Sequence, residues 1–240
     1  MNPLLTFPDG CLIATFRRRE KRFLVEVETG RDKFWVHCNN SGSMLGLLQP
    51  GREVLISPAL RPGRRLPYTL ELVKLEDGWV GVNTLTPNRL LQKSWEQGVL
   101  AEAAGYQHYR SEAKIGASRL DAALTGPEGT LWIEAKNVTL VEDGAACFPD
   151  AVTQRGQKHL LELMALAAAG HRVACFYLVQ RSDAACFAPA DFIDSDYAKL
   201  FWQAVARGIE IWPYQAAVSP AGIALASRLP IITPPGKRRR

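Results

Sequence analysis

The chain has 240 residues, 47% of them hydrophobic, and a formal net charge of +5 at pH 7. This composition excludes an intrinsically disordered chain, and the length suits one large domain or two of roughly 100 residues each, of which we expect two. No run of about 18 apolar residues is present, and Met1–Asp9 lacks the basic and apolar regions of a signal peptide, so we expect neither a membrane span nor a secreted protein.

From about Cys11 to Asn83 the chain consists of short β-rich segments separated by glycine and proline. The predicted strands are Cys11–Phe16, Arg22–Val27, Lys33–His37, Glu53–Ser57, Tyr68–Glu76 and Gly78–Val82. This pattern predicts a closed barrel of five or so strands over residues 1–83. An OB-like fold is the commonest such barrel in nucleic-acid-binding proteins, and an SH3-like barrel would give the same pattern.

Residues 84–233 are predicted to form a mixed sheet flanked by helices. Thr86 is the predicted cap of a first helix, with Pro87 in its first turn. Strands near 112–115, 120–124 and 131–140 follow, then a helix over 152–169 that ends at Gly170. The apolar run Val173–Val179 predicts a strand at the centre of the sheet.

Asp194 or Ser195 is the predicted cap of a last helix, which ends at Gly208. Two short strands follow, and residues 234–240 read as a basic disordered tail. The order α-β-β-β-α-β is that of a restriction-endonuclease-like core. The five cysteines are widely spaced without a CxxC pair, which disfavours disulfides and zinc and favours the cytoplasm.

The candidate catalytic residues lie on a predicted β-hairpin. If its turn is centred between Pro127 and Glu128, Asp121 lies directly opposite Glu134, with Lys136 on the same face. Two carboxylates with water and phosphate oxygens suit Mg²⁺ or Mn²⁺, and a neighbouring lysine can stabilise charge on a phosphate. Asp121, Glu134 and Lys136 are therefore the predicted catalytic residues. Asp121 and Glu134 are also predicted metal ligands, with Glu112 either a third ligand or an exposed strand residue.

Clustered basic residues favour a polyanionic partner, which we expect to be nucleic acid and above all DNA. A helix N-terminus also attracts phosphate. His159 is interpreted as a packed histidine without assigned chemistry. The predicted nucleic-acid-binding residues are Arg17, Arg18, Arg19, Lys21, Arg22, Arg64 and Arg65 in the first domain, and Arg155 and Lys158 at the start of the long helix.

The chain resembles the sugar fermentation stimulation protein family, with matching stretches in the same order over nearly its whole length. The matching stretches are Arg22-Phe23-Leu24, Asn40-Ser41-Gly42, Tyr68-Thr69-Leu70, Gly81-Val82-Asn83-Thr84, Ser118-Arg119-Leu120-Asp121, Glu134 to Leu140, and Phe148-Pro149-Asp150-Ala151 through Arg155-Gly156 to Leu160. The resemblance implies an OB-like domain joined to a PD-(D/E)xK nuclease-like domain, with Asp121, Glu134 and Lys136 as the nuclease-like residues. Small departures, such as Ala135 where valine is common, leave this charged triad intact.

Two functions are therefore open. The first is a DNA-binding protein with a magnesium-dependent phosphodiesterase site. The second, which the family's association with sugar (maltose) utilisation genes implies, is a DNA-binding transcription regulator without turnover. Recognition of a small anionic ligand by the same cluster is a third reading, and it predicts a weak dependence of binding on salt.

Overall fold

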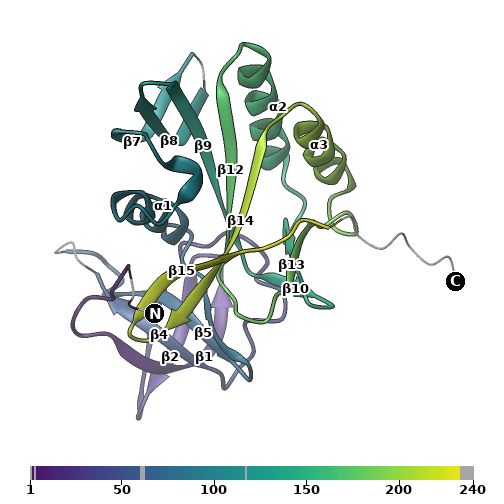
Figure 1. The fold of residues 1–240 in the computed structure, drawn as a ribbon. Helices are drawn as coiled ribbons and strands as arrows, with labels where there is room; N and C mark the ends of the chain where they lie inside the picture. Colours follow the sequence, from purple (N-terminus) through teal and green to yellow (C-terminus); the bar gives the residue numbers. More distant parts are fainter. Residues whose placement is uncertain (1, 3, 60–62, 117, 233–240) are drawn as a thin grey trace, which may run out of the picture.

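The structure is a computed structural model that describes residues 2, 4–59, 63–116 and 118–232. The predicted basic tail at 234–240 therefore lies outside the described residues. An N-terminal β-barrel packs below a larger sheet, which has helices on both faces (Figure 1). None of the helices in the described ranges is long and apolar enough to cross a membrane.

The barrel is built as the sequence predicts. Strands β1 to β5 form a continuous sheet in the order β3-β2-β1-β4-β5, and a parallel pairing of His37 with Thr69 joins β3 to β5 and closes it. Strand β6 extends this sheet beyond β5. Alternate residues such as Val25 and Val27 fill the barrel core. The barrel strands are β1 (Leu12–Glu20), β2 (Leu24–Thr29), β3 (Asp32–His37), β4 (Glu53–Pro58), β5 (Tyr68–Leu75) and β6 (Gly78–Gly81).

The larger sheet has the order β15-β14-β12-β9-β8-β7. The apolar run predicted as a central strand is β12, which pairs in parallel with both β9 and β14. Antiparallel pairing elsewhere makes the sheet mixed, which confirms the predicted class. Its strands are β7 (His108–Ile115), β8 (Ser118–Gly126), β9 (Gly129–Val138), β12 (Arg172–Val179), β14 (Glu210–Ser219) and β15 (Gly222–Arg228).

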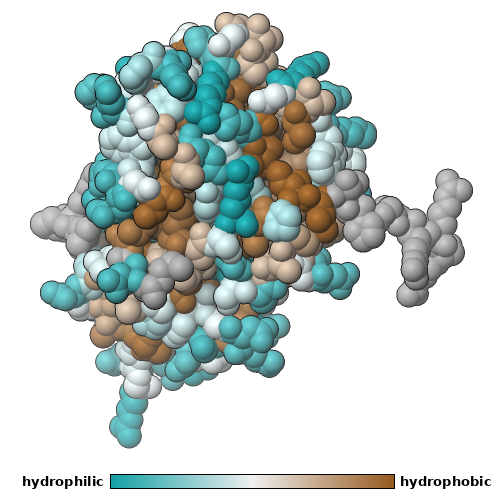
Figure 2. Space-filling model, in the orientation of Figure 1, coloured by the Kyte–Doolittle hydropathy of each residue, from teal (hydrophilic) through white to brown (hydrophobic). Residues whose placement is uncertain are grey.

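Helices cover both faces of this sheet. Helix α1 (Thr86–Glu96) packs on one face, and α2 (Gln154–Ala168) and α3 (Ser195–Ala206) pack on the other (Figure 1). A short 3₁₀ turn, η1 (Ala101–Ala103), follows α1. Gly170 and Gly208 stop α2 and α3 in the left-handed conformation, with φ of 87° and 81°. On the face in Figure 2, hydrophobic residues reach the surface in bands that a hydrophilic strip separates.

Two details differ from the sequence-based expectations. Thr86 is not the cap of α1: Leu85 holds the cap position and makes no side-chain cap bond, although Pro87 lies in the first turn as expected. A small additional sheet, which was not predicted, has the order β10-β11-β13. Its strands are β10 (Leu140–Glu142), β11 (Ala145–Phe148) and β13 (Cys186–Pro189).

The barrel docks directly on the end of the larger sheet. Gly81 N in β6 donates to the carbonyl of Gln180, which follows β12, at 3.0 Å. A Cβ at Gly81 would overlap the Gln180 side-chain amide, so only glycine allows this approach. At a second junction, the Asp150 carboxylate accepts from Met44 N in the barrel at 2.8 Å. The barrel is thereby fixed close to the strands that carry the candidate site.

Candidate active site

The β8–β9 hairpin has the register that the sequence predicts. Ala122 lies opposite Ile133 and Gly126 opposite Gly129, as expected for a turn centred between residues 127 and 128. The regular pairing ends at Ala122–Ile133, one position before Asp121 and Glu134. Both acidic residues therefore lie at the end of the hairpin that is distant from its turn.

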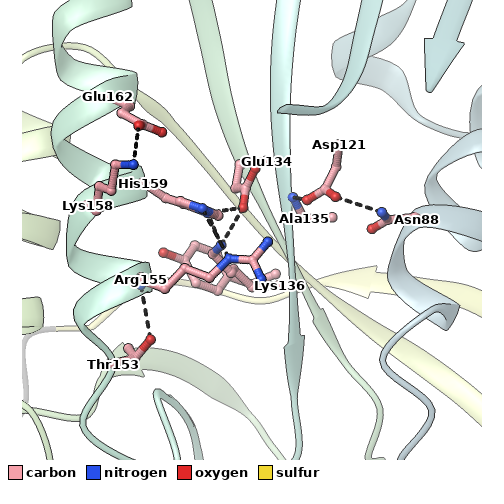
Figure 3. Close-up of polar contacts among 12 residues, drawn as sticks. Asn88, Asp121, Glu134, Ala135, Lys136, Thr153, Arg155, Lys158, His159 and Glu162 are labelled. Carbon is pink, nitrogen blue, oxygen red and sulfur yellow. Dashed lines mark hydrogen bonds and ion pairs between the residues drawn. The ribbon is translucent and has the colours of Figure 1, made fainter. Parts of the chain in front are cut away.

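Asp121 lies beside the backbone of β9. Its Oδ2 accepts a hydrogen bond from Ala135 N at 2.8 Å, and its Oδ1 accepts one from Asn88 Nδ2 on α1 at 2.7 Å. This places the Asp121 carboxylate next to the residue that separates Glu134 from Lys136. In Figure 3 it lies on the α1 side of the strand.

Glu134 points toward α2 instead. Its Oε1 accepts from Lys136 Nζ at 2.6 Å and contacts His159 Nδ1, and its side chain is almost fully buried. The predicted face-to-face placement of Asp121 and Glu134 is therefore wrong, because the two carboxylates approach the same segment of β9 from different sides (Figure 3). Glu134 and Lys136 share a face, as predicted.

A break in strand alternation explains this divergence. Leu120 joins the core beneath α2 and α3, whereas Ala122, two residues later, joins the core beneath α1. In a regular strand, residues two apart share a face. The irregularity falls at Asp121, and Glu112 at the corresponding position of β7 has a φ of 51°, in the left-handed region. The distortion turns the Asp121 side chain toward α1.

The pKa values of the two carboxylates are shifted in opposite directions. Burial opposes ionisation of Glu134, but Lys136 and His159 outweigh it and lower the pKa of Glu134 to about 2. Burial and the charge of Glu134 raise the pKa of Asp121, and the hydrogen bonds from Ala135 N and Asn88 offset only part of this effect. The site thus holds one firmly ionised carboxylate and a second one within its electrostatic range.

Glu112 does not join them. Its exposed carboxylate pairs with Arg119 Nη1 at 3.0 Å. Within the ranges that the structure describes, no group of three or more His, Cys, Asp or Glu side chains is arranged to hold a metal ion. The predicted third metal ligand is therefore not brought to the site, and Glu112 matches the exposed strand residue that was the alternative.

The start of α2 contributes two residues to the site. Thr153 caps the helix by accepting from Gly156 N at 3.0 Å. One turn further, His159 contacts both Glu134 and Lys136, with Lys136 Nζ 3.0 Å from His159 Nδ1. Arg155 Nε lies 3.4 Å from His159 Nε2 (Figure 3). His159 was missed as a site residue, although its spacing of four from Arg155 places both on one helix face.

Lys158, predicted together with Arg155, faces elsewhere. Its ammonium group lies 3.5 Å from Glu162 one turn along the helix, and its side chain is largely exposed. An exposed pair of this kind contributes little to stability and leaves Lys158 outside the cluster. The structure therefore brings Arg155 to the site and leaves Lys158 on the surface of α2.

Two family models match this chain. The model described as "SfsA N-terminal OB domain" matches residues 18–82, and "Sugar fermentation stimulation protein RE domain" matches residues 85–222. The chain belongs to the sugar fermentation stimulation protein family. A relative from Syntrophobacter fumaroxidans, described as a sugar fermentation stimulation protein homolog, is 61% identical over 95% of this chain and 88% of its own length. A homolog from Maridesulfovibrio salexigens is 53% identical over 95% of this chain and 97% of its own.

A solved structure shows the same fold. SfsA of Pyrococcus furiosus, described as in complex with Ca²⁺, superposes with a TM-score of 0.90 at 25% identity, covering 97% of this chain and 100% of that chain. The sequence-based recognition of the family is confirmed. The two-domain architecture, an OB barrel followed by a nuclease-like mixed sheet, is therefore that of the sugar fermentation stimulation proteins.

In this family member the basic residues of β1 are mostly engaged within the barrel. Arg17 pairs with Glu28 at 2.6 Å. Arg18 pairs with two glutamates and lies over the Trp35 ring. Lys21 and Arg22, at the tip of the β1–β2 turn, are exposed and form no ion pair among the described residues. Among the predicted nucleic-acid-binding residues of the barrel, these two and the exposed Arg64 and Arg65 between β4 and β5 are the ones that can meet phosphate without breaking an ion pair among the described residues.

Arg19 has a structural role that the sequence did not reveal. Its guanidinium donates to three backbone carbonyl groups, those of Arg22 at 2.9 Å, Gly42 at 3.0 Å and Asn40 at 2.6 Å. Arg19 is half-buried, and burial lowers the pKa of its guanidinium. It therefore holds the 40–44 loop against the β1–β2 turn with three of its five N–H groups.

Replacing Arg19 with alanine is accordingly expected to lower the free energy of unfolding by about 2 kcal/mol, because three carbonyl groups lose a charged donor. Lys21→Ala, which removes an exposed charge, should change stability by less than about 0.5 kcal/mol. Urea unfolding of both variants tests this. If Arg19→Ala is as stable as Lys21→Ala, and its DNA binding depends less on salt than that of the wild type, Arg19 contacts nucleic acid instead of stabilising the barrel.

Proposed function

We propose that this chain binds nucleic acid, DNA above all, and that its second domain hydrolyses phosphodiester bonds with the help of a divalent ion. One observation carries the proposal: the side chains of Asp121, Glu134 and Lys136 surround one short segment of β9, beside the basic N-terminal turn of α2. Buried acidic groups next to a lysine, with pKa values shifted in opposite directions as those of Asp121 and Glu134 are, are typical of catalytic sites.

The chemistry of the donors fits Mg²⁺ or Mn²⁺. Asp121 and Glu134 would hold the ion, since carboxylate oxygens are its preferred protein ligands. The charge of Glu134 raises the pKa of Asp121, and a cation near both would relieve that repulsion. When bound, such an ion polarises the phosphate and activates a water molecule. The Ca²⁺ named for the Pyrococcus furiosus relative supports a divalent-ion site in the family.

The remaining residues of the cluster have separate roles in this proposal. Lys136 stabilises negative charge that develops on the scissile phosphate. Arg155, exposed beside His159, contacts a neighbouring phosphate of the strand. His159 positions Lys136 and Glu134 through its Nδ1 contacts. The barrel adds phosphate contacts away from the reacting bond, through Lys21, Arg22, Arg64 and Arg65.

A second function is favoured by a different observation. The carboxylates of Asp121 and Glu134 face different helices, and both already accept hydrogen bonds from the protein. A site in this arrangement suits a protein that binds DNA without cleaving it, such as a regulator of sugar (maltose) utilisation genes in a cytoplasmic setting. Turnover requires an ion to compete with Lys136 and His159 for Glu134.

One experiment separates the two functions. The protein is incubated with single- and double-stranded DNA and RNA in Mg²⁺, in Mn²⁺ and in EDTA, and both cleavage and binding are measured at several salt concentrations. Cleavage that requires the divalent ion supports the nuclease. Binding that weakens steeply with salt, without cleavage in either ion, supports the regulator. Salt-independent binding contradicts both, because phosphate contacts release counterions.

A further inference from the structure

A cavity lies apart from the acidic site, between the barrel, the N-terminal segment and the start of α1. Its volume is about 610 Å³, within the range of pockets that bind small molecules. Leu5 and Phe7 of the N-terminal segment supply part of its apolar wall. Polar and charged side chains from the barrel, the segment before α1 and α1 itself form another part of the lining. Of the residues that line it, Arg64 alone has a part in the proposed function, as a phosphate contact on the barrel.

The polar side of the cavity is a preorganised network around Glu71. This buried carboxylate accepts from Ser57 Oγ at 2.6 Å and from Asn83 Nδ2 at 2.8 Å. Asn83 Oδ1 in turn accepts from Asn39 Nδ2 at 2.6 Å and from Leu85 N at 2.9 Å. Linked groups of this kind stay in place, and they offer hydrogen-bonding positions to hydroxyl and amino groups of a ligand.

Two arginines give the cavity an excess of positive charge. Arg64 and Arg89 line it, and neither has an ion-pair partner in the part of the chain that the structure describes. Among the described residues, the hydrogen bond of the Arg64 side chain is a long one of 3.4 Å to Thr69 Oγ1. The barrel arginines Arg17 and Arg18, by contrast, are neutralised by glutamates. The Glu71 carboxylate lies in electrostatic range of Arg89 without forming an ion pair with it, and arginines that form no ion pair are suited to phosphate.

The start of α1 adds to this charge. Leu85 and Thr86 line the cavity, Leu85 makes no side-chain cap bond, and the first turn holds no acidic residue. A helix start of this type carries a partial positive charge. His37 also lines the cavity, but burial and the nearby Arg64 lower its pKa, so it is a neutral hydrogen-bonding group at pH 7.

We propose that this cavity binds one nucleotide, with its phosphate at Arg64 and Arg89 and its sugar or base at the Glu71–Asn83 network. The apolar wall that includes Phe7 then covers a face of the base or sugar. A carboxylate accepts well from hydroxyl and amino groups, and arginine binds phosphate through paired N–H groups. The nucleotide is either a free mononucleotide or the 5′-phosphorylated end of a strand, because both present the same chemistry.

Calorimetry on the full chain in EDTA tests the proposal without any contribution from cleavage. The probes are the four deoxynucleoside 5′-monophosphates, a single-stranded 12-mer with or without a 5′-phosphate, and inorganic phosphate. Binding of a mononucleotide, or tighter binding of the 12-mer when it carries the 5′-phosphate, supports the cavity as a nucleotide site and identifies the source. The proposal is overturned if no mononucleotide binds and the 5′-phosphate does not tighten binding of the 12-mer. It is also overturned if inorganic phosphate binds as tightly as any mononucleotide.

Variants locate the binding. Arg89→Gln and Arg64→Gln are each expected to weaken binding about tenfold, because each removes a charged contact to phosphate. Arg31→Gln, an exposed arginine in the β2–β3 turn that does not line the cavity, removes the same charge and should leave the affinity within about twofold. Equal losses in Arg31→Gln and Arg89→Gln would show a diffuse charge effect and overturn the assignment to the cavity.

Discussion

Replacing Glu134 with glutamine is expected to reduce ion-dependent cleavage of nucleic acid by about 10²–10³-fold, with binding of nucleic acid retained. Glu134 is the firmly ionised member of the pair, with a pKa of about 2 that Lys136 and His159 hold down. Glutamine keeps an oxygen that can accept from Lys136 but carries no charge for a divalent ion. The measurement is the initial cleavage rate at saturating Mn²⁺, beside a circular dichroism melt.

The choice of glutamine over alanine matters at this position. Lys136 is nearly buried, and Glu134 is its ion-pair partner at 2.6 Å. Removing the whole side chain would leave a buried ammonium group unpaired, at a cost of several kcal/mol. A loss of activity in the Glu134→Ala variant could then result from unfolding as well as from the missing carboxylate. The isosteric change separates the two effects.

Glu162→Gln is the matched control. It makes the same change of charge on α2, but Glu162 pairs with the largely exposed Lys158 outside the cluster. Its cleavage rate should stay within about twofold of the wild type, since exposed pairs contribute little. If Glu134→Gln cleaves as fast as Glu162→Gln, the acidic cluster is not the hydrolytic site and the non-catalytic regulator becomes the better account.

Local patterns in the sequence were enough to predict the architecture. The run 173–179 lacks polar alternation because β12 is covered on both faces, and this is what marks it as central. Gly170 and Gly208 end helices where the left-handed conformation is needed. The turn at residues 127 and 128 fixes the hairpin register. Each of these features depends on neighbours in the chain.

The features that escaped prediction depend on distant or irregular backbone. Strand β11 pairs in parallel with β13, about forty residues away, and neither strand has more than four residues. The turn of Asp121 toward α1 follows from a distortion opposite Glu112, whose left-handed φ has no signature in that residue type. Arg19 was predicted to be a free cation because its backbone carbonyl acceptors lie on another loop, and no sequence pattern indicates that contact.

Asp194→Ala is expected to cause the largest loss of stability, about 3 kcal/mol. Asp194 caps α3 by accepting from Tyr197 N at 2.9 Å. The same buried carboxylate also accepts from Thr153 N at 2.9 Å and from Gln157 Nε2 at 2.9 and 3.1 Å, both at the start of α2. One side chain therefore satisfies donors from two helix N-termini. Denaturant unfolding at pH 7 measures the effect.

The pH dependence gives this prediction a distinct signature. Burial opposes ionisation of Asp194, but the hydrogen bonds from Thr153 N, Tyr197 N and Gln157 outweigh it and lower its pKa below the usual 3.8. A carboxylate with a lowered folded-state pKa contributes stability above its unfolded-state pKa and loses that contribution as pH falls through the folded value. The difference between wild type and Asp194→Ala should therefore be full at pH 5 to 7 and shrink below about pH 4.

Asp196→Ala separates this role from a general effect of charge on α3. Asp196 also lies in the first turn of α3, but it is exposed and, within the described part of the chain, its ion pair is with the exposed Lys199. Its loss should cost less than about 1 kcal/mol. Because Asp194 fixes the start of α2, its removal should also lower cleavage through misplacement of Arg155 and His159. A variant that loses stability but keeps the wild-type rate at low temperature would show that the N-terminal turn of α2 is held in place without Asp194.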